Sequence, residues 1–440
     1  MPVIHTGVEH GEHPVRLVVE DDLHRNRLTV FFRVILAIPH FVWLFLWFIA
    51  AVVVVIITWF VTLFAGRPPT GLHGFLARYV RYTTHFYAYL YLVADAYPPF
   101  RGDPGDYVVD VELPDAAPQS RWKTLLRIVL AIPALLLTAA LGGSVRVYGG
   151  RSRGGAGAAT GGGVGGAGGA LLFFCAFFGW FASLVTGRMP RGLRDAGAYS
   201  IGYGAQTAAY LLLVTDRYPN ADPTELLASL PRPPRHPVSL VGDAHDLRRS
   251  RLTVFFRLPL SIPHLVWLTL WTVLAVLFGI VNWFATLARG APPALFHRFF
   301  SAYTRYTLHV SAFLLLAANP FPGFTGEPGR YPLDLELPAE PQRQNRWKTA
   351  FRIVLVIPAA VVNGAVGGAL LLAAFYTWFV ALLLGRAPWG LRNLSAYALR
   401  YGAQQGAYLY LLTDRYPHAS PLEGEDQPEQ LELEPASAVA

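Results

Sequence analysis

The chain has 440 residues, of which 53% are hydrophobic and 15% are charged, with a formal net charge of +8. A soluble domain carries about 25% charged residues, so this composition argues against an ordinary soluble protein. The basic residues cluster beside apolar runs, which favours anionic lipid headgroups over nucleic acid as their partner. The single cysteine, Cys175, excludes a disulfide framework and a cysteine-based metal site.

The first 27 residues are polar and contain no signal peptide of the cleavable type. An uncharged run then extends over 41–66, 26 residues that as a helix reach ~39 Å, more than the ~30 Å hydrocarbon core requires. Pro39 predicts a kink. We therefore expect an interfacial elbow helix over 28–39, a transmembrane helix over 41–65, a turn at 66–69 and a return helix to about Ala96.

This unit is repeated along the chain. A shift of 224 superimposes 27–33 on 251–257, which indicates a tandem duplication with halves at 1–232 and 233–440. A shift of 121 relates the two parts of the first half more weakly, for example Gly66-Arg67 and Gly187-Arg188. The predicted units are 13–105, 106–232, 233–330 and 331–418, with a glycine-rich insertion at 149–169 and a disordered tail at 419–440.

Short segments with strand-like alternation lie between the helix pairs, as in 109–113 and 333–337. If every unit is a helical hairpin, all four such segments lie on one side of the membrane together with both termini, where they could pair into one small sheet. The predicted fold is therefore an all-α polytopic membrane protein. It has four helical-hairpin units, about eight transmembrane helices, interfacial elbows and a small extramembrane β-sheet. We expect it in the cell membrane with cytoplasmic termini.

The second helix of each unit carries polar residues at i, i+3 and i+7, which share one helix face. One interpretation is interhelical hydrogen bonding next to small residues that permit close approach. The other is a polar seam that lines a pathway or ligand pocket between the pseudo-symmetric units. The seam consists of Tyr82, His85, Tyr89, Tyr203, Gln206, Tyr210, Tyr306, His309, Tyr401, Gln404 and Tyr408.

Three arginines occupy equivalent positions in these helices, Arg81, Arg305 and Arg400. In a transmembrane helix these positions would lie somewhat below the level of the lipid headgroups. Their long side chains could extend to lipid phosphates, so they are candidate headgroup-binding residues. His85 and His309 could in principle face each other and ligate haem or a metal, but glutamines replace them in the other two units. The prediction is therefore no metal, no cofactor and no catalytic residues.

The repeated pattern also carries a family resemblance, through Arg-x-x-x-Ala-Ile-Pro-His before the apolar run, Gly-Arg-x-Pro after it, and a closing Asp-Arg-Tyr-Pro. These motifs stand at 33–40, 187–190, 216–219 and 414–417, and they resemble a bacterial membrane family, the domain of unknown function 4389. The resemblance implies a membrane location and a helix-pair fold, and no activity. Two hypotheses on function follow. The first is a non-enzymatic scaffold or assembly protein with unidentified membrane protein partners, and the alternative is a transporter or channel that uses the seam.

Overall fold

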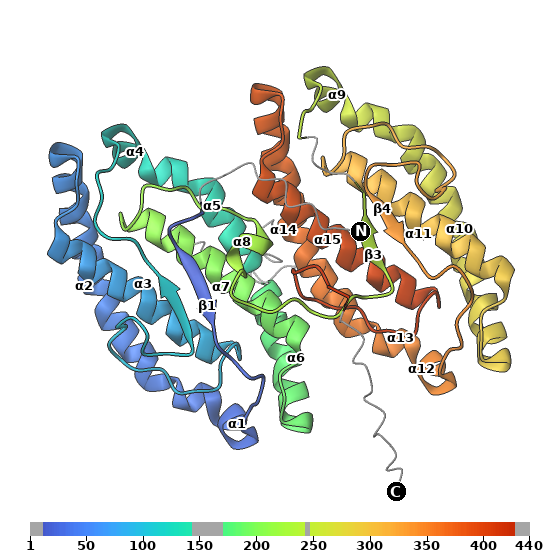
Figure 1. Cartoon of the computed structure of the whole chain (residues 1–440), viewed down its shortest axis with the longest axis horizontal. Helices are drawn as coiled ribbons and strands as arrows, with labels where there is room; N and C mark the ends of the chain where they lie inside the picture. Colours follow the sequence, from blue (N-terminus) through green and yellow to red (C-terminus); the bar gives the residue numbers. More distant parts are fainter. Residues whose placement is uncertain (1–11, 143–169, 243–246, 427–440) are drawn as a thin grey trace, which may run out of the picture.

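The computed structural model describes residues 12–142, 170–242 and 247–426, and Figure 1 shows the two halves of the chain side by side. The first half contains β1 (Arg16–Val19), α1 (Arg27–Leu36), α2 (Ile38–Ala65), α3 (Thr70–Leu90), β2 (Val109–Glu112), α4 (Arg121–Leu125), α5 (Arg127–Leu141), α6 (Ala170–Thr186), α7 (Arg191–Leu211) and α8 (Pro223–Leu226). The second half contains β3 (Ser239–Val241), α9 (Arg251–Phe255), α10 (Arg257–Arg289), α11 (Ala294–Leu314), β4 (Asp334–Glu336), α12 (Arg346–Ala350), α13 (Arg352–Leu355), α14 (Ile357–Leu384) and α15 (Trp389–Leu409).

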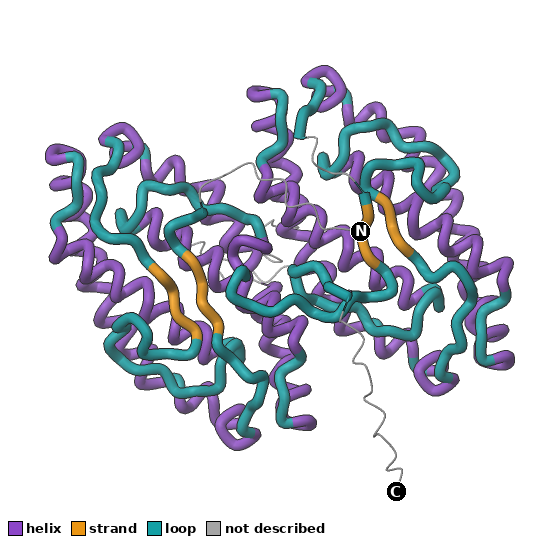
Figure 2. Tube along the Cα trace, viewed as in Figure 1, coloured by secondary structure: helices purple, strands orange, loops and turns teal. Residues whose placement is uncertain are grey.

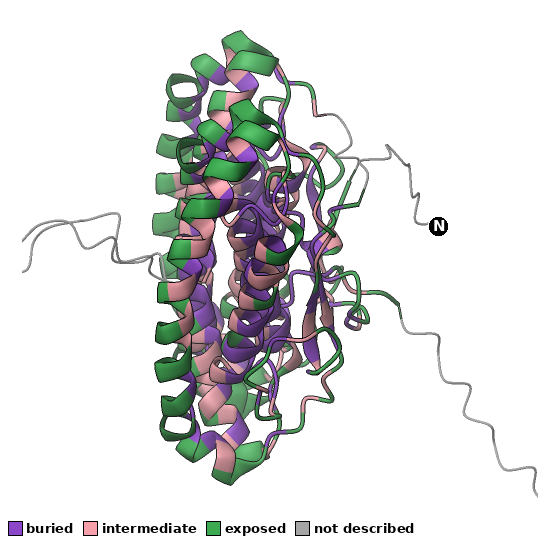
Figure 3. Ribbon diagram, turned by 90° about the vertical axis from the view of Figure 1, so that its left-hand side faces the viewer, coloured by how far each residue is buried: buried purple, intermediate pink, exposed green. Residues whose placement is uncertain are grey.

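These elements form three layers, which Figure 3 shows edge-on. The apolar helices, α2 and α10 among them, make one outer layer, and the strands and long loops make the other. The inner helices α3, α7, α11 and α15 lie between, packed against apolar helices on one side and strands on the other. Burial follows the layers: α2 buries only His40, Ala51, Thr58 and Thr62, whereas α7 buries most of its residues. The core of the protein is therefore the inner helix layer.

Helix boundaries follow local signals. Pro39 lies in the first turn of α2, where proline removes no needed hydrogen bond, so the boundary falls at Ala37 rather than after the proline. α2 ends at Gly66, whose φ of 73° places it in the left-handed region that favours glycine. Gly187, Gly290 and Gly385 repeat this ending with φ values of 72°, 78° and 68°.

Three helical segments are long and apolar enough to cross a membrane by length and composition: Arg27–Ala65, Arg257–Arg289 and Arg352–Leu384. Two shorter apolar helices cover Arg127–Leu141 and Leu171–Thr186. The prediction of about eight spans is not confirmed. The inner helices, predicted as return spans, are too polar to qualify, because one face of each contacts the strand layer.

The two units of each half pack head to tail. The elbow of one unit lies against the turn of the other: the indole nitrogen of Trp59 donates to the Thr124 carbonyl over 2.8 Å, and that of Trp180 to the Val30 carbonyl over 3.0 Å. Trp283 and Trp378 make the same bonds to Thr349 and Val254. Consequently α1 and α4 lie at opposite ends of the first half, as α9 and α12 do in the second (Figure 1). This arrangement differs from the predicted one, in which all elbows share one side, because hairpins that cap each other's turns must run in opposite directions.

The strands also differ from the predicted single sheet. β1 pairs antiparallel with β2, with Leu17 opposite Val111, and β3 pairs antiparallel with β4, with Leu240 opposite Leu335. Figure 2 shows the two pairs well separated, one over each half. Each pair forms within a half because its strands pack on two inner helices that contact each other, β1 on α7 and β2 on α3, and β3 on α15 and β4 on α11. The predicted insertion at 149–169 lies outside the described residues, as does the part of the predicted tail beyond Asp426. Residues 419–426, which the prediction placed in a disordered tail, instead pack against the protein and bury Ala419, Ser420 and Leu422.

Candidate functional site

The most regular polar feature of the structure is an arginine clamp at the start of each apolar helix. Its members, Arg33, Arg127, Arg257 and Arg352, are all buried. In unit four, the guanidinium of Arg352 donates to the Tyr408 and Thr413 carbonyls at 2.5 and 3.0 Å and to Asp414 Oδ1 at 2.8 Å. The clamp therefore pins the elbow to the carboxyl end of the inner helix, where carbonyl groups lack helical partners.

The same contacts recur in the other units. Arg33 bonds the Tyr89 and Ala94 carbonyls and Asp95, and Arg127 bonds the Tyr210 and Thr215 carbonyls and Asp216. In unit three Asn319 replaces the aspartate, 3.3 Å from Arg257. Each guanidinium also stacks over an aromatic ring, with centroid distances of 4.4 Å to Tyr89, 4.7 Å to Tyr210, 4.5 Å to Phe313 and 4.3 Å to Tyr408.

The seam tyrosines are thereby accounted for. Tyr89, Tyr210 and Tyr408 cover clamp arginines, and Tyr82 and Tyr306 pair through their hydroxyls with His40 and His264 at 2.7 and 2.8 Å. Tyr203 and Tyr401 are buried in the inner layer. All seven seam tyrosines are buried within the protein.

The seam histidines bind strand carboxylates instead of each other. His85 Nε2 lies 2.9 Å from Asp110 Oδ1 on β2, and His309 Nε2 lies 3.0 Å from Asp334 Oδ1 on β4. The backbone amide of Gly105 donates to Asp110 Oδ2 over 2.7 Å. Burial alone would raise the pKa of Asp110, but hydrogen bonds from His85 and from the Gly105 and Val111 amides hold that pKa below its usual value. The same balance holds the pKa of Asp334 below its usual value.

The glutamines of units two and four occupy the same helix position and bond the backbone of the strand layer. Gln206 donates to the Val15 carbonyl over 2.9 Å and accepts from the Asn220 amide. Gln404 donates to the Val238 carbonyl over 3.0 Å and accepts from the His418 amide. The seam is therefore four separate attachments of inner helices to strands and loops, and its histidines and glutamines do not converge.

The three candidate headgroup-binding arginines face the strand layer, not the apolar face. Arg81 Nε lies 3.1 Å from Asp110 Oδ1, and Arg305 Nε lies 3.0 Å from Asp334 Oδ1. Arg400 donates to three carbonyls, those of Ser420, Pro421 and Leu422, at 2.8–3.0 Å. The expected reach towards phosphates is not seen, because each guanidinium finds anionic or carbonyl partners beside its own helix.

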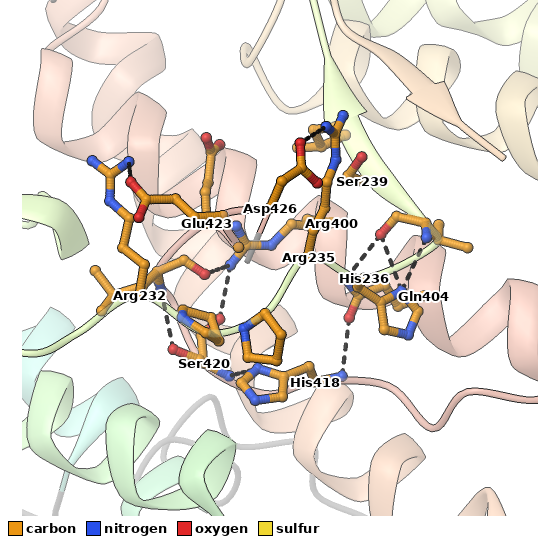
Figure 4. A pocket seen from close by; sticks show the side chains of 17 residues that line it. Arg232, Arg235, His236, Ser239, Arg400, Gln404, His418, Ser420, Glu423 and Asp426 are labelled. Carbon is orange, nitrogen blue, oxygen red and sulfur yellow. Dashed lines mark hydrogen bonds and ion pairs between the residues drawn. The ribbon is translucent and has the colours of Figure 1, made fainter. Parts of the chain in front are cut away.

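Arg400 also lines a cavity of about 480 Å³ where the segment between the halves meets the end of the described chain (Figure 4). Arg232 lies 2.6 Å from Glu425, and Arg235 lies 3.0 Å from Asp426. These pairs attach the carboxyl-terminal segment across the junction, and Ser420 adds a hydrogen bond of 2.7 Å to the buried Asp195 of α7. The Arg232–Glu425 ion pair and the Ser420–Asp195 hydrogen bond therefore join the two halves beside this cavity.

Metal binding gains no support from the geometry: no group of three or more histidine, cysteine or acidic side chains that could hold an ion occurs within residues 12–142, 170–242 and 247–426. The clamp and the strand aspartates were not singled out from the sequence. The sequence does mark both groups. An arginine precedes the Ile-Pro dipeptide in all four units, and an aspartate begins the strand motif in both halves.

Comparison with known families agrees with this four-unit architecture. The family described as Domain of unknown function (DUF4389) matches four times, at residues 27–101, 162–221, 251–325 and 346–420. The chain belongs to this family, in tandem copies. Searches of curated proteins and of solved structures found no match.

Proposed function

We propose that this protein is a non-enzymatic membrane scaffold that lies along the bilayer. Its apolar helix layer would sit in one leaflet, and its strand-and-loop layer would face the cytoplasm and bind partner proteins. The observation that carries this proposal is the apolar face itself. Exposed large hydrophobic side chains follow the outer helices from end to end, as from Leu28 to Phe64 along α1 and α2 and from Leu252 to Phe284 along α9 and α10. A face of this size on a monomer is typical of a surface that water does not contact.

The length of this face favours an arrangement parallel to the membrane. Leu28 and Phe64 are 64 − 28 = 36 residues apart, which corresponds to about 54 Å of helix contour. A helix tilted by up to ~40° needs a length of only about 39 Å to span a ~30 Å core, so the apolar face is longer than a crossing requires. The apolar layer is one helix thick, roughly 10 Å, and so fits within a single leaflet of ~15 Å.

Residues at both ends of the layer fit an interfacial position. Trp122 and Trp347 are 75% and 76% exposed and precede Lys123 and Lys348, a pairing that favours the headgroup region. The exposed arginines at the elbows and turns would then meet anionic headgroups around the perimeter. They are Arg27, Arg67, Arg121, Arg188, Arg251, Arg289, Arg346 and Arg386.

Eight crossing helices remain the competing arrangement. In it the layers stand upright, so the two ends of each half emerge on opposite sides of the membrane. Arg67 and Arg188 mark these ends, because each lies in the turn that packs against the other unit's elbow. In our proposal both ends lie on the cytoplasmic side.

Cysteine labelling tests the proposal directly. In a Cys175→Ser chain, the single variants Arg67→Cys and Arg188→Cys are both expected to react with a membrane-impermeant maleimide in inside-out vesicles and to stay protected in intact cells. Ser229→Cys, in the loop layer, serves as the cytoplasmic control. Reaction of one turn from outside and of the other from inside would replace our proposal with the upright, multi-pass arrangement.

The bonding of the seam supports the scaffold over the transporter. If the seam carried solute, removing its imidazoles would change transport. We expect the double variant His85→Ala plus His309→Ala to leave ion and small-solute flux in proteoliposomes equal to that of the unmodified protein and of protein-free liposomes. A flux present in the unmodified protein and lost in the variant would favour the channel.

A further inference from the structure

The second half contains a cavity of about 340 Å³ between α11, α14 and α15. α10 packs on α11 and α14 packs on α15, and α11 contacts α15 between them. Asn363 and Gly367 of α14 line the cavity, and the adjacent Gly364 is exposed on the apolar face. The cavity therefore lies where the inner layer meets the apolar face.

Its wall offers uncharged hydrogen-bonding groups. Thr304 is 5% exposed, and within the described part of the chain its hydroxyl has no hydrogen-bond partner. Ser311 and Asn363 add a hydroxyl and an amide, and no charged residue is among the described residues that line the cavity. A buried hydroxyl without a partner is unfavourable, so a ligand that bonds Thr304 would recover that free energy.

The first half carries different residues at the positions that line this cavity. The counterparts of Thr304, Ser311 and Gly406 are Val80, Tyr87 and Ala208, which are larger or apolar. The counterpart of Asn363 is Thr138, whose hydroxyl bonds Thr207 over 2.9 Å and so joins α5 to α7. At these positions the second half therefore carries smaller or unbonded polar groups where the first half carries larger, apolar or bonded ones.

We propose that this cavity binds the head of an uncharged, hydroxyl-bearing lipid of the diacylglycerol type, taken from the bilayer. Neutral hydroxyl and amide groups match glycerol and ester oxygens, whereas a phosphate would enter without a cation to pair with it. The cavity accommodates the glycerol end, and the acyl chains would run along the neighbouring apolar face. This inference rests on the proposed contact of that face with the bilayer.

Native mass spectrometry of the full chain in detergent, titrated with dioleoylglycerol, tests the proposal. We expect one bound molecule. Gly367 of α14 lines the cavity and has open space where a Cβ would lie, so Gly367→Leu places a side chain there and its affinity should fall at least about tenfold. Thr304→Val removes one hydrogen bond and should weaken binding roughly three- to tenfold. Thr84→Val in the first half removes a hydroxyl already bonded to the Val80 carbonyl and should change affinity less than about twofold.

The outcomes separate the alternatives. Unchanged dioleoylglycerol binding by Gly367→Leu, or equal occupancy by dioleoylphosphatidylcholine, would overturn the site. If Gly367→Leu is not recovered folded, Thr304→Val decides alone, and full affinity in that variant refutes the assignment. Because binding is measured in detergent, its failure is distinguishable from failure of the labelling test of membrane arrangement.

Discussion

Replacing Arg352 by methionine is expected to lower the free energy of unfolding by about 3 kcal/mol, since buried carbonyl groups lose their charged donor, and Asp414, which keeps a contact to Lys348, loses its buried partner. The substitution keeps an apolar stem of similar length but leaves Asp414 and the Tyr408 and Thr413 carbonyls without the guanidinium. Thermal and denaturant unfolding of the purified protein in detergent measures the effect.

Unit three supplies the matched comparison. Arg257→Met removes the equivalent carbonyl contacts, but the side chain that loses its partner is the neutral Asn319 rather than a carboxylate. The loss of unfolding free energy should therefore be smaller. Arg346→Met, at an exposed position in α12 shortly before Arg352, should change the free energy of unfolding by less than about 0.5 kcal/mol. Equal losses for Arg257→Met and Arg352→Met would show that the carboxylate contributes nothing to the clamp.

Neutralising a strand aspartate should have the next largest effect. Asp110→Asn removes the negative charge and one of the two acceptor oxygens that serve His85, Arg81 and two backbone amides, and we expect a loss of about 3 kcal/mol at neutral pH. Because the folded-state pKa of Asp110 lies below the unfolded value of about 3.9, the carboxylate's stabilisation is complete above that value. It disappears as the pH falls through the lower, folded-state pKa.

The difference in stability between Asp110→Asn and the unmodified protein should therefore be constant above about pH 5 and shrink under acid conditions. Glu112→Gln is the control on the same strand, because Glu112 pairs with Arg16 at the exposed surface and should contribute at most about 1 kcal/mol. A difference that persists unchanged at acid pH would mean that Asp110 acts through packing rather than through its charge.

Local features of the fold were predictable from the sequence. The four units, the helix boundary near Pro39 and the helix end at Gly66 depend on neighbouring residues only, and repetition makes them stand out. The layered arrangement was not predictable, since an uncharged helix has the same sequence pattern whether it crosses a membrane or lies along it. The inner helices illustrate the difficulty. Their polar faces contact strands, and the position of those strands is set by tertiary contacts that the local sequence does not reveal.

The candidate site was predicted in part. Tyr82 and His85 do share the buried face of α3, as their spacing predicted. Their partners His40 and Asp110 lie 42 and 25 residues away in the chain, so spacing along one helix could not reveal them. The clamp escaped notice for the same reason, because Arg33 meets its carbonyl and carboxylate partners 56–62 residues later.

The reciprocal capping of elbow and turn has a consequence for the smallest piece that can fold. In a single hairpin unit, the indole equivalent to that of Trp59 and the turn beside it would lack the elbow of a second unit to contact. Two identical units related by a twofold axis could supply these contacts to each other. A chain with one such unit is therefore expected to be a symmetric homodimer. On that basis each half of the present protein is a covalently joined dimer, and separating its two units should yield fragments that reassociate rather than fold alone.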